Sequence, residues 1–187
     1  MKPRLILPLI AAAFLITGCA SGNTAAEKRA DILKMRDETL TKLYKIQPGA
    51  RTRIRTAAGY GVFTNVGVHI IWLGAGGGWG VVHDNQTGKN TYMNMGSAGV
   101  GFGLGLKDFR GVFVFTQKKY LDWFTDKGWD ASAQADAAAK AKDKGDAWAG
   151  AVDVAPGIYL YQITENGLAL QATIQGTKYW KDSELNK

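Results

Sequence analysis

Glycine alternates with large apolar residues through the middle of this chain, and this alternation constrains the fold more than any other feature. Residues 59 to 111 contain 15 of the chain's 24 glycines, interleaved with Val, Ile, Phe, Trp and Tyr. Because β-branched and aromatic residues favour strands and are scarce in disordered segments, this region predicts β structure. The alternation is clearest from 97 to 106, where one strand face carries nothing larger than the hydroxymethyl group of Ser97.

A strand face without side chains needs a physical reason, because glycine in a strand costs about 0.5 to 1 kcal/mol relative to alanine. Strand glycines mark places where a backbone or a ligand approaches closely, or where a sheet bends sharply. We therefore expect either close packing of a helix or curling of the sheet toward a barrel. A ligand groove on the bare face is the alternative.

Turn residues between apolar runs predict two hairpins. Residues 78 to 84 and 90 to 95 flank a turn that contains Gly88. Residues 157 to 164 and 168 to 175 flank an Asn-Gly pair, which is a strong hairpin signal. The remaining elements predicted in this half of the chain are one or two strands in 60–73, strands at 111–116 and 129–137, and a short helix at 117–127.

A long amphipathic helix is predicted near the N-terminus. Thr24 followed by Glu27 has the spacing of a capping box, and Pro48 with Gly49 ends the helix after about Ile46. Its cations and acids are balanced, so we expect its apolar stripe to pack on its own domain, with membrane insertion as the alternative. Together these elements predict an α+β fold: a twisted, glycine-rich antiparallel sheet with a barrel-like curl as one option, packed by an N-terminal helix and a short internal helix.

The first 19 residues have the order of a secretory signal. Lys2 and Arg4 precede an apolar run from 5 to 16, and small residues then lead into Cys19. The run is too short to span a bilayer, which takes about 20 residues. The string ITGC resembles the lipobox of bacterial lipoproteins, which implies lipid attachment at Cys19. Because Ala20 and not aspartate follows, the resemblance implies the outer membrane, with the domain facing the periplasm.

These features divide the chain into a signal peptide (1–18), a lipidated tether (19–23) and a single domain (24–187). The full chain carries a formal charge of +7, and loss of the two leader cations leaves +5. A modest basic excess suits an anionic membrane surface, peptidoglycan or an acidic partner, and export argues against nucleic acid. The only cysteine is used by the anchor, so packing alone must hold the fold.

No residue pattern indicates catalysis, a cofactor or a metal. The glycine run from 74 to 80 has a tryptophan at the third position of a GxGxxG spacing and no following phosphate-binding lysine motif. His69 and His83 have no further ligands at characteristic spacing. A hydrolytic set of Ser97, His83 and Asp84 requires the fold to assemble it, and no nucleophile-elbow sequence supports it. We predict a protein without enzymatic activity.

Three arginines at alternate positions form the most informative basic cluster. As a strand, Arg51, Arg53 and Arg55 place three guanidinium groups on one face, whereas a helix pairs Arg51 with Arg55 and separates Arg53. The strand arrangement makes a phosphate-binding edge, because arginine binds phosphate oxygens in a bidentate manner. A solvated or salt-bridged face is the alternative.

Several short motifs recur in one order along the chain. They are AAGYGVF at 57–63, GGGWGVV at 76–82, the alternating strand 99–105, DFRGVFVF at 108–115, NGL at 166–168, QGT at 175–177, and then Asp182 and Asn186. In this order they resemble the SYLF domain, a lipid-binding domain also found in actin-patch proteins of yeast and animals. The similarity spans roughly residues 30 to 187.

This resemblance implies binding of phosphoinositides or other anionic lipids through an amphipathic N-terminal segment and basic residues. The candidate headgroup-binding residues are Arg51, Arg53, Arg55, Lys28, Arg29, Lys34 and Arg36. Actin is not expected as a partner of an exported protein. The sequence thus predicts an outer-membrane lipoprotein whose domain binds anionic phospholipid. The alternative is an envelope structural lipoprotein that docks a protein or peptidoglycan.

Overall fold

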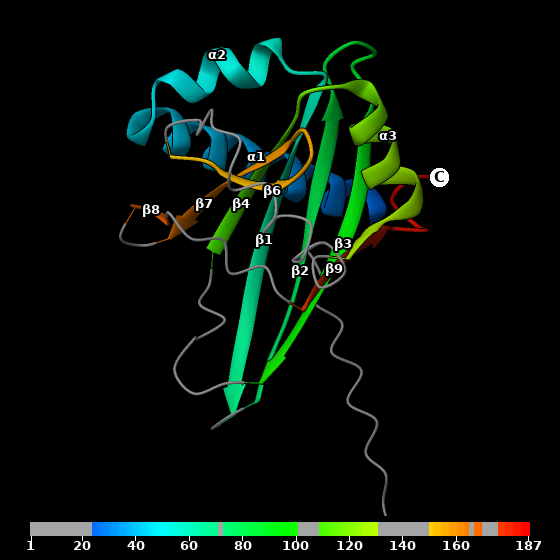
Figure 1. The fold of residues 1–187 in the computed structure, drawn as a ribbon. Helices are drawn as coiled ribbons and strands as arrows, with labels where there is room; N and C mark the ends of the chain where they lie inside the picture. The colour runs from blue at the N-terminus through cyan, green and yellow to red at the C-terminus, as the bar shows by residue number, and fades with distance from the viewer. Residues whose placement is uncertain (1–23, 71–72, 101–108, 131–149, 165–166, 170–175) are drawn as a thin grey trace, which may run out of the picture.

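The computed structural model describes residues 24–70, 73–100, 109–130, 150–164, 167–169 and 176–187 (Figure 1). Within these ranges the helices are α1 (Ala25–Ile46), α2 (Gly49–Thr56) and α3 (Lys118–Lys127). The strands are β1 (Gly59–Ile70), β2 (Leu73–Asp84), β3 (Asn90–Val100), β4 (Phe109–Phe115), β5 (Trp129–Asp130), β6 (Val152–Ala155), β7 (Ile158–Thr164), β8 (Gly167–Ala169) and β9 (Thr177–Lys181).

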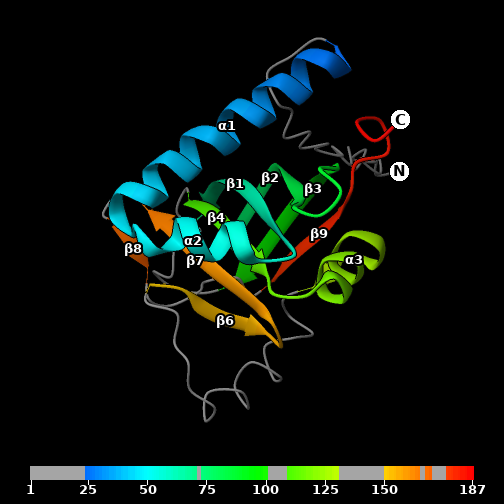
Figure 2. The same cartoon turned by 90° about the horizontal axis from the view of Figure 1, so that it is seen from above.

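All described strands join one antiparallel sheet in the order β5-β9-β3-β2-β1-β4-β7-β6, with β8 paired to β7. The sheet curls into a half-barrel, α1 and α2 cover one face, and α3 lies against the other (Figures 1 and 2). The predicted α+β fold is confirmed, including the curled sheet, the N-terminal helix and the short internal helix. The additional helix α2 corresponds to the helical alternative for the segment of Arg51, Arg53 and Arg55.

Local signals fixed several elements at the predicted positions. The capping box is formed, because Thr24 Oγ1 accepts the Glu27 N–H at 3.2 Å and Glu27 Oε2 accepts the Thr24 N–H at 2.9 Å. The β2–β3 and β7–β8 hairpins are present. Of the strand predicted at 129–137, residues 129–130 form β5. Residues 131–137, 101–106 and 170–175 of the predicted strands lie outside the described ranges.

The arginine cluster lies on a helix, so the strand arrangement of Arg51, Arg53 and Arg55 is wrong. Ala50 and Ile54 are one helical turn apart and both are buried against the sheet, which favours the helical spacing over a strand. The Asn85 side chain, from the β2–β3 turn, donates to the Ile54 carbonyl at 2.7 Å and to the Ala57 carbonyl at 3.0 Å. These two bonds satisfy carbonyl groups that the end of α2 leaves without helical partners.

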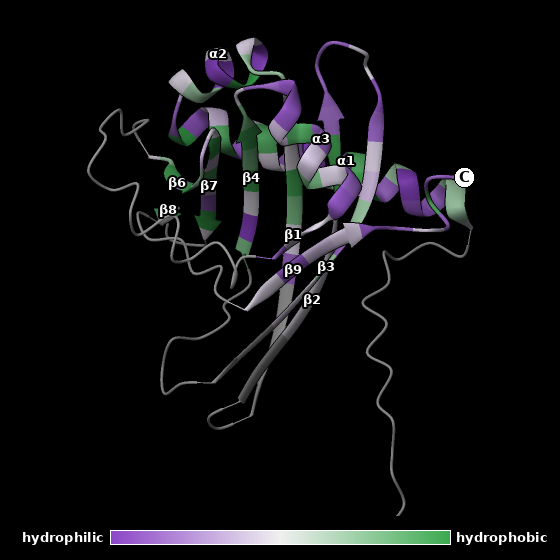
Figure 3. Cartoon of the chain, turned by 45° about the vertical axis from the view of Figure 1, so that its right-hand side comes forward, coloured by the Kyte–Doolittle hydropathy of each residue, from purple (hydrophilic) through white to green (hydrophobic). Residues whose placement is uncertain are grey.

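The two faces of the sheet carry separate apolar cores. On the α1 side, the buried residues include Leu40, Leu43, Ala50, Ile54, Val62, Val112, Val114, Tyr161 and Ile163. The inner face holds an aromatic core around Phe113, whose ring lies within 6 Å of Phe63, Phe124, Trp129 and Tyr179 by centroid distance. Hydropathy colouring shows β4 as strongly hydrophobic and the β2–β3 turn as hydrophilic (Figure 3).

The apolar stripe of α1 packs on its own domain, as expected. Ile32, Leu40 and Leu43 are buried, and Leu43 has no exposed surface. Among the described helices, none combines the length and the apolar character needed to cross a membrane. The burial of Ile32, Leu40 and Leu43 confirms the core-packing interpretation of this helix.

Two glycines of β2 explain why this part of the sheet needs residues without side chains. A Cβ atom on Gly78 would lie 1.7 Å from the carbonyl oxygen of Thr64, and one on Gly80 would lie 2.2 Å from that of Val62. The β1 backbone therefore approaches β2 closely at both positions as the sheet curls. Close approach of the neighbouring backbone explains the need for glycine at both positions.

Asp84 fixes the turn that carries the Asn85 cap. Its Oδ1 atom accepts the N–H groups of Gln86 at 2.9 Å and Thr87 at 3.3 Å, and Oδ2 lies 3.4 Å from the Lys118 ammonium. Burial alone would raise the pKa of this carboxyl group, but the hydrogen bonds and the Lys118 charge outweigh burial and lower it. The ionised form of Asp84 is thus the form that stabilises the turn.

The lowered pKa predicts a pH dependence of stability. The unfolded-state pKa of an aspartate is about 3.9, so the Asp84 contribution is complete above that value and is lost as the pH falls through the lower folded-state pKa. Urea unfolding from pH 7 to pH 2.5 should show a smaller loss of stability for Asp84→Asn than for the wild type. Parallel pH profiles of the two proteins would contradict this assignment.

Candidate functional site

Charge is distributed unevenly along the two N-terminal helices. Residues 25 to 40 contain four cations and four acids, so this part of α1 is neutral. Residues 42 to 55 contain five cations and no acid, and after Glu38 the next acidic residue in the sequence is Asp84. We call residues 42–55, the end of α1 with nearly all of α2, the basic elbow. Its cations are Lys42, Lys45, Arg51, Arg53 and Arg55.

The elbow has a defined shape because its inner residues are anchored. The Gln47 N–H donates to the Leu43 carbonyl at 2.7 Å and ends α1, and α2 begins at Gly49. The Arg51 guanidinium lies 4.4 Å from the centroid of the Tyr44 ring, a cation–π distance. Burial raises the pKa of Tyr44, so this ring is a neutral phenol near pH 7. Packing thus holds α2 against α1.

The elbow cations differ in what they contact. Arg53 is half-buried and donates to the Tyr161 hydroxyl at 3.1 Å, so it positions α2 on the sheet. Lys42 donates to the Thr164 carbonyl at 3.2 Å and remains exposed, as do Lys45 and Arg55. Like Arg51, these three side chains form no salt bridge with any carboxylate of the described residues.

The elbow also exposes an apolar side chain. Ile46 is 40% exposed, and large hydrophobic side chains with comparable exposure occur among the described residues only at Trp123 and Trp180. Ile46 lies between Lys45 and the start of α2. An exposed isoleucine flanked by cations is an arrangement that suits a surface with anionic headgroups above an apolar layer.

The four candidate headgroup-binding residues on α1 make different contacts from the arginines of α2. Arg29 is bound to the C-terminal tail, since Nε donates to the Leu185 carbonyl at 2.9 Å and Nη2 to the Lys187 carbonyl at 3.1 Å. Arg36 pairs with its neighbour Asp37 at 2.8 Å. Lys28 is half-buried and Lys34 is exposed. The structure therefore does not bring the seven predicted residues into one surface.

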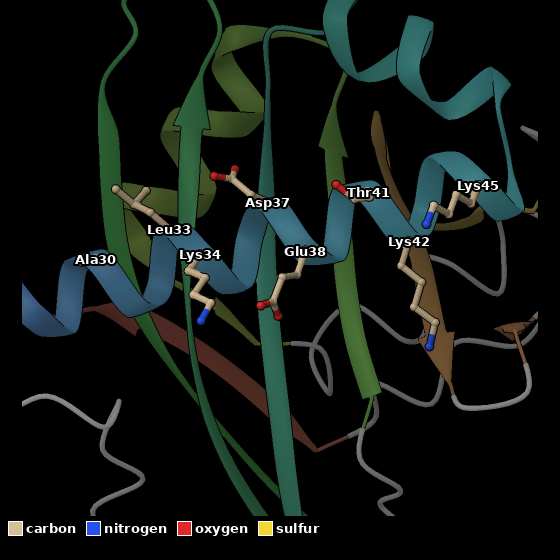
Figure 4. Close-up of a pocket in the computed structure, with 8 residues that line it drawn as sticks. All are labelled: Ala30, Leu33, Lys34, Asp37, Glu38, Thr41, Lys42 and Lys45. Carbon is tan, nitrogen blue, oxygen red and sulfur yellow. The ribbon is translucent and has the colours of Figure 1, made fainter.

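A groove of about 840 Å³ follows the flank of α1 toward the elbow. Its described lining consists of Ala30, Leu33, Lys34, Asp37, Glu38, Thr41, Lys42 and Lys45 (Figure 4). Lys34, Glu38 and Lys42 lie along one side of the helix, one turn apart, so charge alternates there. Arg110 of β4 also reaches Glu38, at 3.5 Å. The lining becomes purely cationic only at Lys42 and Lys45.

Lys42 and Lys45 are the residues that the sequence interpretation missed. The average charge over all of α1 hides the difference between its neutral first half and the cationic end that carries these two lysines. The signal that could have found them is the acid-free stretch from 39 to 83, which begins inside the helix. A charge count over a sliding window separates the two halves of α1.

Ser97 lies far from the other two residues of the hypothetical hydrolytic set, His83 and Asp84. His83 is paired across the β2–β3 hairpin with Asn90, seven residues from Ser97 along β3, which is about 24 Å in a strand. The His83 ring contacts the Asn90 side chain at 2.8 Å, and the Asp84 carboxylate is used by the turn. Within the described ranges, no group of three or more His, Cys, Asp or Glu residues is placed to hold a metal ion.

The structure defines an α+β half-barrel domain with a basic elbow beside its N-terminal helix. No family model matches the chain. The chain is similar to Beta cell expansion factor A of Aeromonas veronii, with 37% identity over 164 residues. The match covers 88% of this chain and 61% of the relative, so the chain spans about three fifths of the length of that protein. Cys19 and the predicted leader lie outside the described residues.

Proposed function

We propose that this protein is a non-catalytic lipoprotein, attached by Cys19 to the periplasmic side of the outer membrane, whose domain binds anionic phospholipid through the basic elbow. The observation that carries the proposal is the elbow itself: five cations and no acid in fourteen residues, with an exposed isoleucine among them. The ITGC string supports the anchor, and the ordered SYLF-like motifs support a lipid ligand.

Electrostatics sets the scale of the proposed interaction. A Lys or Arg close to an anionic membrane contributes about 1 kcal/mol, and the attraction fades within a Debye length of about 8 Å at physiological salt. Lys42, Lys45, Arg51 and Arg55 are all exposed at the elbow. Four such contacts give at most about 4 kcal/mol, which is weak alone and sufficient to orient a domain that acyl chains already hold.

These magnitudes assign different roles to the anchor and the elbow. Two or more acyl chains give stable attachment, whereas a single weak signal gives reversible binding. The anchor therefore supplies residence at the bilayer. The elbow decides which face of the half-barrel meets the headgroups.

Vesicle binding tests the proposal. A soluble form covering residues 20–187, without the acyl chains, should float with vesicles that contain phosphatidylglycerol or cardiolipin and should ignore phosphatidylcholine vesicles. Binding should weaken steeply between 50 and 300 mM salt, because the contacts are screened.

Failure to bind the anionic vesicles at low salt would contradict the lipid proposal. Crosslinking in intact cells would then test the rival function. Protein or peptidoglycan adducts formed through the domain would favour a structural or protein-interaction lipoprotein.

A further inference from the structure

A second cationic site lies at the other end of α1. It is a pocket of about 470 Å³, within the usual range of about 300 to 1,000 Å³ for ligand pockets. Three distant parts of the sequence contribute four cations: Arg29 comes from α1, Lys89 from the β2–β3 turn, and Lys181 and Lys187 from the C-terminal segment. No acidic side chain belongs to its described lining.

The wall of this pocket is held rigidly by the C-terminal tail. Asn186 accepts the Tyr92 N–H at 2.9 Å and donates to the Tyr92 carbonyl at 2.7 Å, which extends the β3 edge. Asp182 accepts the N–H groups of Glu184 and Leu185, both at 2.8 Å. Leu185 is buried, so the tail is fixed by packing as well as by hydrogen bonds.

The cations of the pocket keep most of their hydrogen-bonding capacity. Arg29 uses two of its five N–H donors on tail carbonyl oxygens, which leaves three. Lys181 contacts Asp126 at 2.7 Å, and a lysine ammonium has two further donors. Lys89 and Lys187 form no salt bridge with a carboxylate of the described residues. Asp126 pairs with only one of the four cations, so the pocket keeps an excess of positive charge, which favours a bound anion.

We infer that this pocket binds a phosphate group. A phosphate presents several acceptor oxygens in a compact tetrahedron, which matches one planar guanidinium and three ammonium groups from three parts of the chain. The Asn90 and Thr91 residues of the lining add polar groups at the same wall. Sixteen residues of helix, about 24 Å, separate Arg29 from Lys45 of the elbow, so the pocket is a distinct site.

Two sources could supply the phosphate: a soluble phosphate compound or the headgroup of a membrane phospholipid. The second source rests on the proposed anchor. Thr24, where the described structure begins, is five residues after Cys19, and five residues span at most about 18 Å. An acylated Cys19 would therefore keep the pocket end of α1 close to the bilayer.

Titration of the full chain in a neutral detergent tests the inference. Inorganic phosphate, compared with chloride at equal ionic strength, should shift the amide NMR signals of Asn90, Thr91 and Asn186 in a saturable manner. Lys89→Ala with Lys187→Ala should weaken binding about tenfold or more, because two charge-assisted contacts are lost. The matched control, Lys119→Ala with Lys127→Ala, removes the same charge from the exposed side of α3 and should leave phosphate affinity within about twofold, because these residues lie outside both the pocket and the elbow.

The outcomes separate this inference from the proposed function. Shifts no larger than those of chloride, or equal affinity in the two double variants, would overturn the phosphate site whatever the elbow does. If the pocket variant also reduces binding to phosphatidylglycerol vesicles, the phosphate comes from the bilayer. If the pocket variant loses phosphate binding and keeps vesicle binding, the ligand is a soluble phosphate compound.

Discussion

Gly78→Ala is expected to cost at least about 3 kcal/mol of folding free energy, enough to leave a protein of ordinary stability marginal or unfolded. The new Cβ would lie 1.7 Å from the Thr64 carbonyl oxygen, and the nearest obstacles include backbone atoms that cannot turn aside. This clash can be relieved only if β1 and β2 separate, which breaks hydrogen bonds between these two strands. Urea or thermal unfolding followed by circular dichroism measures the loss.

The neighbouring glycine provides a matched control. A Cβ on Gly77 would meet only the Met95 carbonyl oxygen, at 4.0 Å, so Gly77→Ala should change stability by less than about 1 kcal/mol. The two variants differ by one position in the same strand and add the same methyl group. Equal effects would show that glycine is required here for a reason other than close approach of β1.

Replacing the four exposed elbow cations, Lys42, Lys45, Arg51 and Arg55, with alanine should reduce affinity for anionic vesicles at least about 100-fold. Each charge contributes about 1 kcal/mol at the membrane, and about 1.4 kcal/mol corresponds to a factor of ten. Arg53 is left in place because its bond to Tyr161 holds α2 on the sheet. Co-sedimentation with phosphatidylglycerol vesicles at 50 mM salt measures the loss.

The control for the elbow variant is Lys28→Ala with Lys34→Ala. These cations lie on the neutral half of α1, so their removal should weaken vesicle binding by less than about threefold after correction for net charge. The double variant Arg51→Ala with Arg55→Ala also removes two positive charges, here from α2, and should weaken vesicle binding about 30-fold. Equal losses in the two double variants would mean that net charge, and not the elbow, governs binding.

The parts of the fold that sequence predicts well depend on short-range chemistry. Thr24 and Glu27 cap α1 through atoms three residues apart, and the β2–β3 hairpin is set by its own turn residues. The curl of the sheet was one of the options that the strand glycines indicated, beside close packing of a helix and a ligand groove. Each of these inferences needs only neighbours in the chain or in the adjacent strand.

The parts that sequence missed depend on contacts between distant segments. The eight residues of α2 begin at Gly49, directly after Pro48, and the Asn85 side chain, 31 residues from Ile54, caps the end of the helix. Arg29 resembles a surface cation until the fold brings a carbonyl oxygen 156 residues away to its guanidinium. Helical propensity and charge patterns carry no information about either contact.

The central claim is that the elbow faces the anionic membrane, and labels placed on opposite parts of the domain test it most directly. Cys19 is the only cysteine, so a form of the protein that begins after it contains none. A single nitroxide label can then be attached at Thr52→Cys, on the exposed face of α2, or at Lys127→Cys, at the end of α3. With phosphatidylglycerol vesicles that contain a nickel-chelating lipid, relaxation of the Thr52 label should be strongly enhanced and that of the Lys127 label should change little. Equal enhancement at both positions, or a stronger effect at Lys127, would contradict the claim.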